Sequence, residues 1–191
     1  MLGSALTSIL QRDFAGIIEF NRINKSVTGK NEVVFLDVLK RYDLNVIFHG
    51  LNIGYVVNAI GMVKQVIDEE NPEDVWRARE INSEFALRLN EFSQLSGIKV
   101  IQIGTDCVYS GLKGLYSEGE AFDPTDVYGK TKEVGELALD ESMIIRTSII
   151  GKESNSGRVA GNKWVGCFRD NAWNRDLSTY IGSGKVIELK Q

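Results

Sequence analysis

The sequence alternates short, apolar, β-rich runs with longer runs of helical periodicity, and this order constrains the fold more than any other feature. Strands are expected at Gly16–Phe20, Glu32–Leu36, Tyr55–Ala59, Lys99–Gly104 and Met143–Ile149. Helices are expected at Gly3–Arg12, Val38–His49, Pro72–Ser96 and Asp126–Leu139. Strands separated by helices of this length predict βαβ units and a parallel sheet.

Two strand runs have the composition of central strands. Tyr-Val-Val-Asn-Ala-Ile at 55–60 and Val-Ile-Gln-Ile-Gly at 100–104 are almost continuously apolar. A parallel strand covered on both faces reads this way, because neither face meets water. We therefore expect both runs to lie in the middle of the sheet.

Composition narrows the function classes. The 191 residues, with 43% hydrophobic and 25% charged residues, suit one soluble domain. No apolar run reaches the roughly 20 residues of a membrane span, and no secretory signal begins the sequence. A net charge of -4 without a basic cluster argues against nucleic acid as a partner. Cys107 and Cys167 are the two cysteines and lack metal-ligand spacing, so we expect no metal site and a reduced, cytoplasmic protein.

The segment Tyr128-Gly-Lys-Thr-Lys132 places a phenol and an ammonium four residues apart near the start of an expected helix. Side chains at this spacing are neighbours on one helical face. A nearby ammonium stabilises a phenolate, which brings tyrosine into a useful range for acid–base catalysis. The spacing alone is more often that of two solvated helix residues, so the interpretation depends on the surrounding sequence.

Thr105 supplies that context, because it directly follows an expected central strand. Ligands of open α/β sheets bind at the carboxyl ends of the strands. A hydroxyl there could hydrogen-bond a substrate carbonyl while Tyr128 delivers the proton. The alternative is a strand-end threonine that only satisfies its own loop, and the order of the two motifs favours the first interpretation.

Four motifs together resemble one family. They are Thr-Asp-Cys-Val-Tyr-Ser-Gly at 105–111, Gly-Leu-Tyr-Ser-Glu at 114–118, Asp-Val-Tyr-Gly-Lys-Thr-Lys-Glu-Val-Gly-Glu at 126–136 and Ile-Arg-Thr-Ser-Ile-Ile-Gly at 145–151. In this order and spacing they resemble the dTDP-4-dehydrorhamnose reductase family, extended short-chain dehydrogenases that act on nucleotide-activated sugars. The resemblance runs from Met1 to about Gly151. It implies a Rossmann-like, doubly wound parallel α/β sheet.

The resemblance also implies the catalytic group. It assigns catalysis to Thr105, Tyr128 and Lys132, and it makes Lys132 a ligand of the nicotinamide ribose as well. The expected reaction is NADPH-dependent reduction of a nucleotide-linked 4-keto sugar. Two alternatives stay open: epimerisation of a nucleotide sugar by the same three side chains, and a non-catalytic protein that binds cofactor or nucleotide sugar.

Further cofactor-binding positions follow from the resemblance. Asn58, Ala59 and Gly61 resemble the fourth family strand and the turn along the cofactor, where small residues allow close backbone approach. Asn82 resembles an asparagine that faces the active site, although a solvated mid-helix asparagine is an equal alternative. Asp37 resembles the acid that binds adenine, and it is equally suited to cap the helix that follows.

Cofactor choice is expected to depend on the turn after the second family strand. An acid there bonds the ribose 2′-hydroxyl of NAD, whereas an arginine accommodates the 2′-phosphate of NADP. Asn21 and Arg22 occupy this turn, and Glu19 lies within the strand before it. The sequence therefore favours NADP over NAD.

The chain departs from the family at both ends. Gly3 resembles the last glycine of a Gly-x-x-Gly-x-x-Gly turn, whose role is helix–strand packing more than phosphate contact. The first family strand would precede it, so we expect a sheet that lacks this strand. Residues 1–151 are expected to form the cofactor-binding domain and 152–191 a short, irregular remnant of the substrate-binding portion. A homodimer is an expectation from the family alone.

Overall fold

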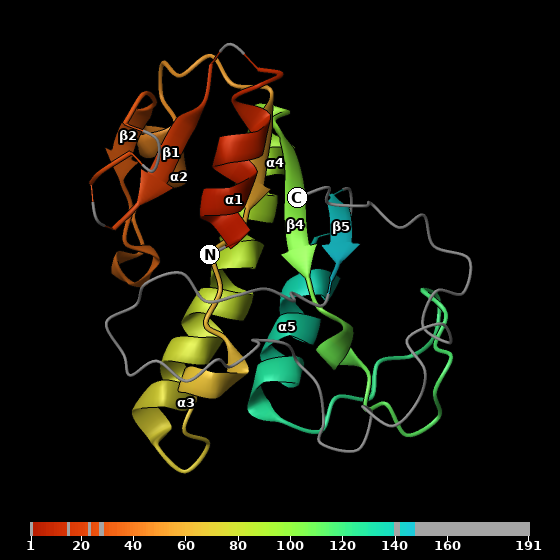
Figure 1. Cartoon of the computed structure of the whole chain (residues 1–191). Coiled ribbons are helices and arrows are strands. Elements are labelled where there is room, and N and C mark those ends of the chain that lie inside the picture. Colours follow the sequence, from red (N-terminus) through yellow and green to blue (C-terminus); the bar gives the residue numbers. More distant parts are fainter. Residues whose placement is uncertain (1, 15, 23, 27–28, 140–141, 148–191) are drawn as a thin grey trace.

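The computed structural model describes residues 2–14, 16–22, 24–26, 29–139 and 142–147 (Figure 1). The predicted C-terminal portion, residues 152–191, and Cys167 lie outside these residues. Within the described ranges, no helix is both long enough and apolar enough to cross a membrane.

Five described strands form two parallel sheets. β1 (Ile18–Asn21) pairs with β2 (Glu32–Phe35) in one sheet. The other sheet has the order β3-β4-β5, with β4 (Lys99–Gly104) between β3 (Tyr55–Asn58) and β5 (Met143–Arg146). Every pairing is parallel, which confirms the Rossmann-like α/β class expected from the alternation of elements.

Helical segments connect the strands (Figure 1). The N-terminal helix is α1 (Leu2–Leu10), and β2 is followed by the short segments η1 (Val38–Lys40) and α2 (Leu44–Ile47). The connection from β3 to β4 contains η2 (Lys64–Val66), α3 (Pro72–Arg79), the π-helical segment η3 (Glu80–Glu84) and α4 (Phe85–Ser96). The connection from β4 to β5 contains η4 (Asp106–Val108) and α5 (Val127–Leu137).

Three expectations about the elements were wrong in detail. The single helix expected at Val38–His49 is two short segments, because Arg41 adopts a left-handed conformation and Asp43 starts a new helix as its N-cap. The long helix Pro72–Ser96 is present but contains the π-helical turn. β3 is less covered than a central strand should be. Tyr55 is 68% exposed, and Val57, which lies on the same face of the strand, is exposed as well.

One helix packs against strands of both sheets. Phe85, Leu89 and Phe92 of α4 belong to the main buried cluster, together with residues that follow β2. Phe20 of β1 and Val56 of β3 pack against this same cluster. An aromatic stack extends it, with ring centroids 4.6 Å apart for Phe48 and Phe92 and 4.8 Å apart for Phe20 and Phe48. The buried members of the cluster are Leu36, Val38, Leu44, Phe48, Phe85, Leu89 and Phe92.

No hydrogen-bonded ladder joins β1 to β3 among the described strands. The described part of the chain therefore contains two separate parallel sheets. Gly3 of α1 lies close to the end of β3, and a Cβ built at Gly3 would be 3.7 Å from the Cβ of Ala59. This contact fits the helix–strand packing role predicted for Gly3.

Helix α5 packs against η3 at backbone distance. A Cβ built at Gly135 would overlap the carbonyl oxygen of Asn82, so only glycine fits this contact. The hydroxyl of Ser83 donates to the carbonyl oxygen of Thr131 at 2.8 Å, which ties the same two segments together. Close backbone packing therefore fixes the helix that carries Tyr128 and Lys132.

We predict that Gly135→Ala destabilises the protein by about 1–3 kcal/mol, because the new methyl overfills a packed contact. In an open helical site the same change stabilises by about 0.5–1 kcal/mol, so the sign of the effect is informative. Urea unfolding measures it. Gly119→Ala is the control, since a Cβ at Gly119 meets nothing within 4 Å. A Gly135→Ala protein as stable as the parent would contradict this packing.

Candidate active site

The end of β4 and the first turns of α5 form the candidate site. The Nζ atom of Lys132 donates to the carbonyl oxygen of Ile103, two residues before Thr105, at 2.8 Å. A Cβ built at Gly129 would overlap the carbonyl oxygen of Cys107, two residues after Thr105. These two contacts bracket Thr105, so the structure brings the strand end and the start of α5 together.

All three predicted catalytic side chains are buried. Their exposed fractions are 3% for Thr105, 8% for Tyr128 and 6% for Lys132. Tyr128 and Lys132 both belong to the buried residues of α5, as the four-residue spacing predicted. The solvated alternative for this pair is therefore wrong.

Thr105 has local hydrogen-bonding duties. It adopts an extended conformation and caps η4, because its Oγ1 accepts a hydrogen bond from the backbone N–H of Cys107 at 3.2 Å. The same hydroxyl donates to Oδ1 of Asp106 at 3.3 Å. The loop-satisfying role is thus present, and the hydroxyl still lies at the strand end where ligands of such sheets bind.

Burial controls the charge of Lys132. It lowers the pKa of the ammonium, and the carboxylate of Glu136, one turn further along α5, raises it and partly offsets that effect. Lysine in this setting carries a weakly held proton beside a tyrosine on the same helical face.

Asn82 is buried and fully engaged, so the solvated alternative is wrong for this residue too. Its Oδ1 accepts from the N–H of Met62 at 2.9 Å, and its Nδ2 donates to the carbonyl oxygen of Met62 at 3.0 Å. Nδ2 also donates to Oγ1 of Thr131 at 3.1 Å. Asn82 therefore joins the segment after β3 to α5 from inside a π-helical turn, a geometry that recurs at functional sites.

The turn after β3 is built around Asn58. Its Nδ2 donates to Oε1 of Gln102 on β4 at 2.7 Å, and its Oδ1 accepts from the N–H of Ile60 at 3.1 Å. A Cβ at Gly61 would meet Oδ1 of Asn82 at an ordinary 3.5 Å. The packing of the described residues therefore does not by itself require glycine at 61, and the role of Gly61 at a cofactor stays a prediction.

The ends of β1 and β2 carry the other predicted cofactor positions. Asn21 donates through Nδ2 to the carbonyl oxygen of Lys25 at 3.2 Å. Arg22 is exposed, and within the described part of the chain it has no hydrogen bond or ion pair. Asp37 caps η1 by accepting from the N–H of Leu39, so its capping role is confirmed. Its contact with adenine stays a prediction.

Glu19 is turned away from a ribose-binding role. Its carboxylate is buried and accepts from Oγ of Ser26 at 2.6 Å and from Nδ2 of Asn31 at 2.9 Å. These bonds hold Ser26 and Asn31 against β1. The carboxylate is therefore committed to its own loop, and Arg22 is the charged side chain available at the end of β1.

An ion pair under the site was missed by the sequence reasoning. Nε of Arg146, the last residue of β5, donates to Oε2 of the buried Glu136 at 2.8 Å. A Cβ at Gly104 would overlap Oε1 of Glu136, so glycine at the end of β4 makes room for this pair. Glycine at 129 and 135 inside a helix indicates only the close backbone approach of α5, because helix interiors disfavour glycine unless another backbone comes close, and it does not indicate this ion pair.

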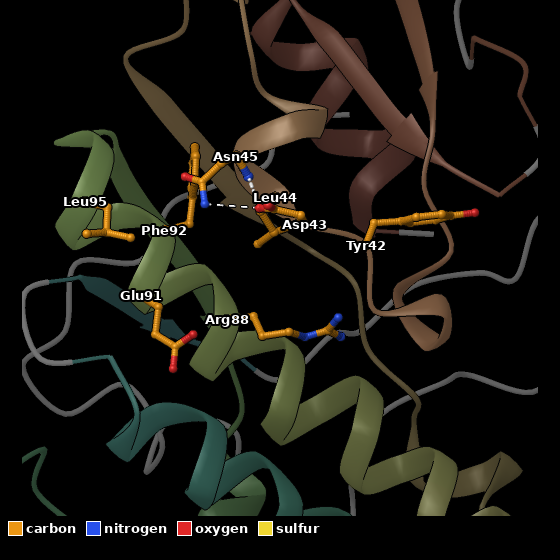
Figure 2. A pocket seen from close by; sticks show the side chains of 8 residues that line it. All are labelled: Tyr42, Asp43, Leu44, Asn45, Arg88, Glu91, Phe92 and Leu95. Atoms are coloured by element: carbon orange, nitrogen blue, oxygen red, sulfur yellow. Dashed lines mark hydrogen bonds between the residues drawn. The ribbon is translucent and has the colours of Figure 1, made fainter.

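A small pocket lies elsewhere, between α2 and α4 (Figure 2). Its volume is about 160 Å³, and the predicted catalytic residues do not line it. Ligand pockets are usually larger than about 300 Å³, so we assign it no role. The lining side chains are Tyr42, Asp43, Leu44, Asn45, Arg88, Glu91, Phe92 and Leu95.

The fold is that of a Rossmann-like domain, and the candidate site lies at the carboxyl end of β4. Residues 1–175 match the family described as the RmlD substrate binding domain. The chain belongs to this family. Among curated proteins, none matches it closely enough in sequence to count as a relative.

Solved structures agree with the family. A hypothetical dTDP-4-dehydrorhamnose reductase from Sulfolobus tokodaii is 26% identical, with a TM-score of 0.61 over 73% of this chain and 49% of its own. A dTDP-4-dehydrorhamnose reductase from Bacillus anthracis, in complex with NADP, is 19% identical, with a TM-score of 0.54 over 73% of this chain and 55% of its own. A UDP-glucuronic acid 4-epimerase from Bacillus cereus, in complex with NAD, is 20% identical, with a TM-score of 0.56 over 72% and 48%. This chain therefore spans about half the length of the structures it matches.

We predict that Asn82→Ala destabilises the protein by more than about 2 kcal/mol, because it leaves the buried backbone N–H and carbonyl groups of Met62 without these partners and removes one hydrogen bond to Thr131. Chemical unfolding measures the change. Asn90→Ala, further along the same helical stretch, is the matched control and is expected to stay within about 0.5 kcal/mol of the parent. Equal effects of the two substitutions would show that the Asn82 bonds contribute nothing specific.

Proposed function

We propose that this chain is the cofactor-binding part of an NADPH-dependent reductase of a nucleotide-linked 4-keto sugar. The observation that carries the proposal is the docking of α5 on the end of β4, which buries Tyr128 and Lys132 beside Thr105. Membership of the RmlD family and the fold shared with dTDP-4-dehydrorhamnose reductases support it.

Each side chain has a defined role in this proposal. Tyr128 donates a proton to the carbonyl oxygen of the sugar, and the hydroxyl of Thr105 hydrogen-bonds that oxygen. The ammonium of Lys132 stabilises the phenolate that Tyr128 becomes, and it binds the nicotinamide ribose. The nicotinamide, when bound, supplies the hydride.

The described residues fit a dinucleotide along the ends of β1, β2 and β3. Gly61 leaves space at the turn after β3, where Asn58 and Ala59 would line the cofactor. Asp37 would bind the adenine, and Asn82 would face the active site. Gly3 would hold α1 against this edge. We propose NADPH over NADH, since Glu19 is engaged in its own loop whereas Arg22 is exposed.

The reductase and an epimerase of the same superfamily would use the same three groups. They differ in whether the hydride leaves with the product or returns to the opposite face of the sugar. The proposed setting is the cytoplasm, with a nucleotide sugar as the partner molecule and a homodimer as the assembly. Net oxidation of NADPH upon addition of the keto sugar distinguishes reduction from epimerisation.

We expect Tyr128→Phe to lower the rate of reduction of a dTDP-4-keto sugar by at least about 100-fold, because the proton donor is lost. NADPH affinity, measured by fluorescence titration, should change little. Tyr55→Phe is the control, because Tyr55 is 68% exposed at the start of β3. Undiminished turnover in Tyr128→Phe would remove this tyrosine from the mechanism. Failure of the parent chain to bind millimolar NADPH would contradict the proposal for the chain itself.

Cofactor choice has its own test. Arg22→Asp should weaken NADPH binding by about tenfold or more and favour NADH, since a carboxylate repels the 2′-phosphate and can bond a 2′-hydroxyl. Fluorescence titration with both cofactors gives the ratio of affinities. Lys25→Asp makes the same charge change at an exposed position three residues away and should leave the ratio nearly unchanged. Equal ratios in Arg22→Asp and the parent would contradict the assignment.

A further inference from the structure

Arg146 connects three parts of the molecule at the end of β5. Its Nε donates to Glu136 on α5, as described above. Its Nη1 donates to the hydroxyl oxygen of Tyr109 and to the carbonyl oxygen of Glu118, both at 3.3 Å. The last two partners belong to the long connection that leads from Thr105 to Tyr128. One guanidinium at the end of β5 therefore contacts both α5 and the connection between β4 and α5.

The segment 109–123 packs against this guanidinium through two aromatic rings. The guanidinium carbon of Arg146 lies 4.9 Å from the ring centroid of Phe122 and 5.6 Å from that of Tyr109, both within cation–π range. The ring of Tyr109 stacks on that of Tyr116 at 4.6 Å. Arg146 and this group of rings thus form the inner support of the segment.

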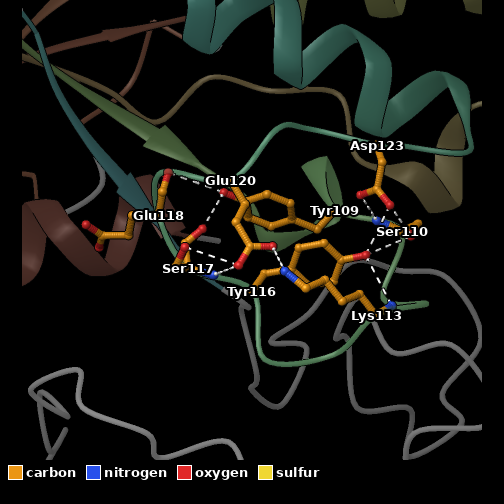
Figure 3. A network of polar contacts seen from close by, with 8 residues as sticks. All are labelled: Tyr109, Ser110, Lys113, Tyr116, Ser117, Glu118, Glu120 and Asp123. Carbon is orange, nitrogen blue, oxygen red and sulfur yellow. Dashed lines mark hydrogen bonds and ion pairs between the residues drawn. The ribbon is translucent and has the colours of Figure 1, made fainter.

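Asp123 closes the segment on its outer side (Figure 3). Its Oδ1 accepts from the N–H of Ser110 at 2.7 Å, and its Oδ2 accepts from the hydroxyl of Tyr116 at 3.0 Å. These bonds join the two ends of the segment, and Lys113 and Glu120 pair across its exposed side. The connection between Thr105 and Tyr128 is therefore an ordered loop, held from inside by Arg146.

Glu136 shares the buried face of α5 with Lys132. It lies four residues after Lys132 on the buried face of α5. Its side chain is 2% exposed, and one of its two oxygens, Oε1, is buried without a hydrogen-bond partner. A buried carboxylate with a single paired oxygen leaves part of its charge uncompensated, and the adjacent ammonium is the group that this charge affects.

Several elements that carry charged or titratable groups pack against the helix of Lys132. Among the described residues, Glu136 is the one whose charge opposes the lowering of the Lys132 pKa by burial. The other such groups on these elements are Tyr128, Lys130 and Glu133 on α5, Asp106 on η4, Glu80 and Glu84 on η3, Glu73, Asp74, Arg77 and Arg79 on α3, Arg88 and Glu91 on α4, Lys99 on β4, and Arg146, which reaches α5 from β5 through its pair with Glu136.

We propose that Glu136 and Arg146 are positioning residues of the site: the buried carboxylate supplies a negative charge one helical turn from the ammonium of Lys132, and the guanidinium anchors the 109–123 segment that joins Thr105 to Tyr128. The inference rests on the proposed function of these three residues. Neither positioning residue contacts the reacting atoms. Each acts through a neighbour, the first electrostatically and the second by holding the loop.

Glu136→Gln tests the electrostatic part, because it removes the charge and keeps the shape. The protein is labelled with ¹³C at lysine Cε, and the Lys132 resonance is assigned by its loss in Lys132→Met. We expect the titration midpoint of Lys132 to fall, which makes the neutral amine about three- to tenfold more abundant below the midpoint. Glu133→Gln makes the same charge change on the same helix and should leave the midpoint unchanged.

A double variant guards against misfolding. Glu136→Gln leaves Arg146 without its anionic partner, and breaking a buried pair is destabilising. Glu136→Gln combined with Arg146→Met removes both charges and should lower the midpoint as well. A folded Glu136→Gln protein, or a folded double variant, with the parental midpoint would overturn the electrostatic part of the proposal.

Arg146→Lys tests the anchoring part. Lysine keeps a positive charge for Glu136 but lacks the planar guanidinium that packs on Tyr109 and Phe122. We expect trypsin to cleave after Lys113 at least about threefold faster than in the parent, since the loop opens more often. Parental cleavage kinetics would overturn the anchoring part.

These measurements need neither cofactor nor turnover, so they separate two kinds of failure. A lowered Lys132 midpoint in a chain that reduces no sugar would support the positioning pair and contradict the proposed function. If the parent chain is an active enzyme but Glu136→Gln leaves the Lys132 midpoint unchanged and Arg146→Lys leaves the cleavage rate unchanged, only the positioning roles are contradicted.

Discussion

The close approach of α5 to its neighbours is the constraint on which the candidate site depends. Gly129 brings the helix against the backbone of η4, and Gly135 brings it against the backbone of η3. Any side chain at either position would push the helix outward and withdraw Lys132 from the carbonyl oxygen of Ile103. Glycine lowers the intrinsic stability of the helix at these two positions, and the tertiary contacts that it permits offset this cost. The position of Lys132 at the candidate site thus depends on glycine at these two positions.

The alternation of runs was enough to predict the parallel α/β class and, at Lys99–Gly104, a strand with its observed bounds. Local sequence could not predict the break at Arg41, because a left-handed residue between two short helices is selected by packing of Leu44 and Phe48 in the core. Burial of β3 was overestimated because an apolar run shows what a strand can bury and leaves open which neighbours are present to cover it.

The site divides in the same way. Spacing placed Tyr128 and Lys132 on one helical face and Thr105 at a strand end, since these are local consequences of period and order. The partnership of Glu136 with Arg146 joins residues ten apart on different elements, and no local pattern indicates it. The engagement of Asn82 with Met62 and Thr131 is equally non-local.

The packing of both sheets against α4 determines the distance between β1 and β3. Strands joined by a ladder are held about 4.7–4.9 Å apart by hydrogen-bond length, which permits little variation. Among the described strands, β1 and β3 are instead related through rings and aliphatic side chains around Phe48 and Phe92. The distance between the ends of β1 and β3 is therefore set by side-chain volume, so a change from phenylalanine to leucine in this stack would alter the distance between the two ends of the proposed dinucleotide site without contacting either end.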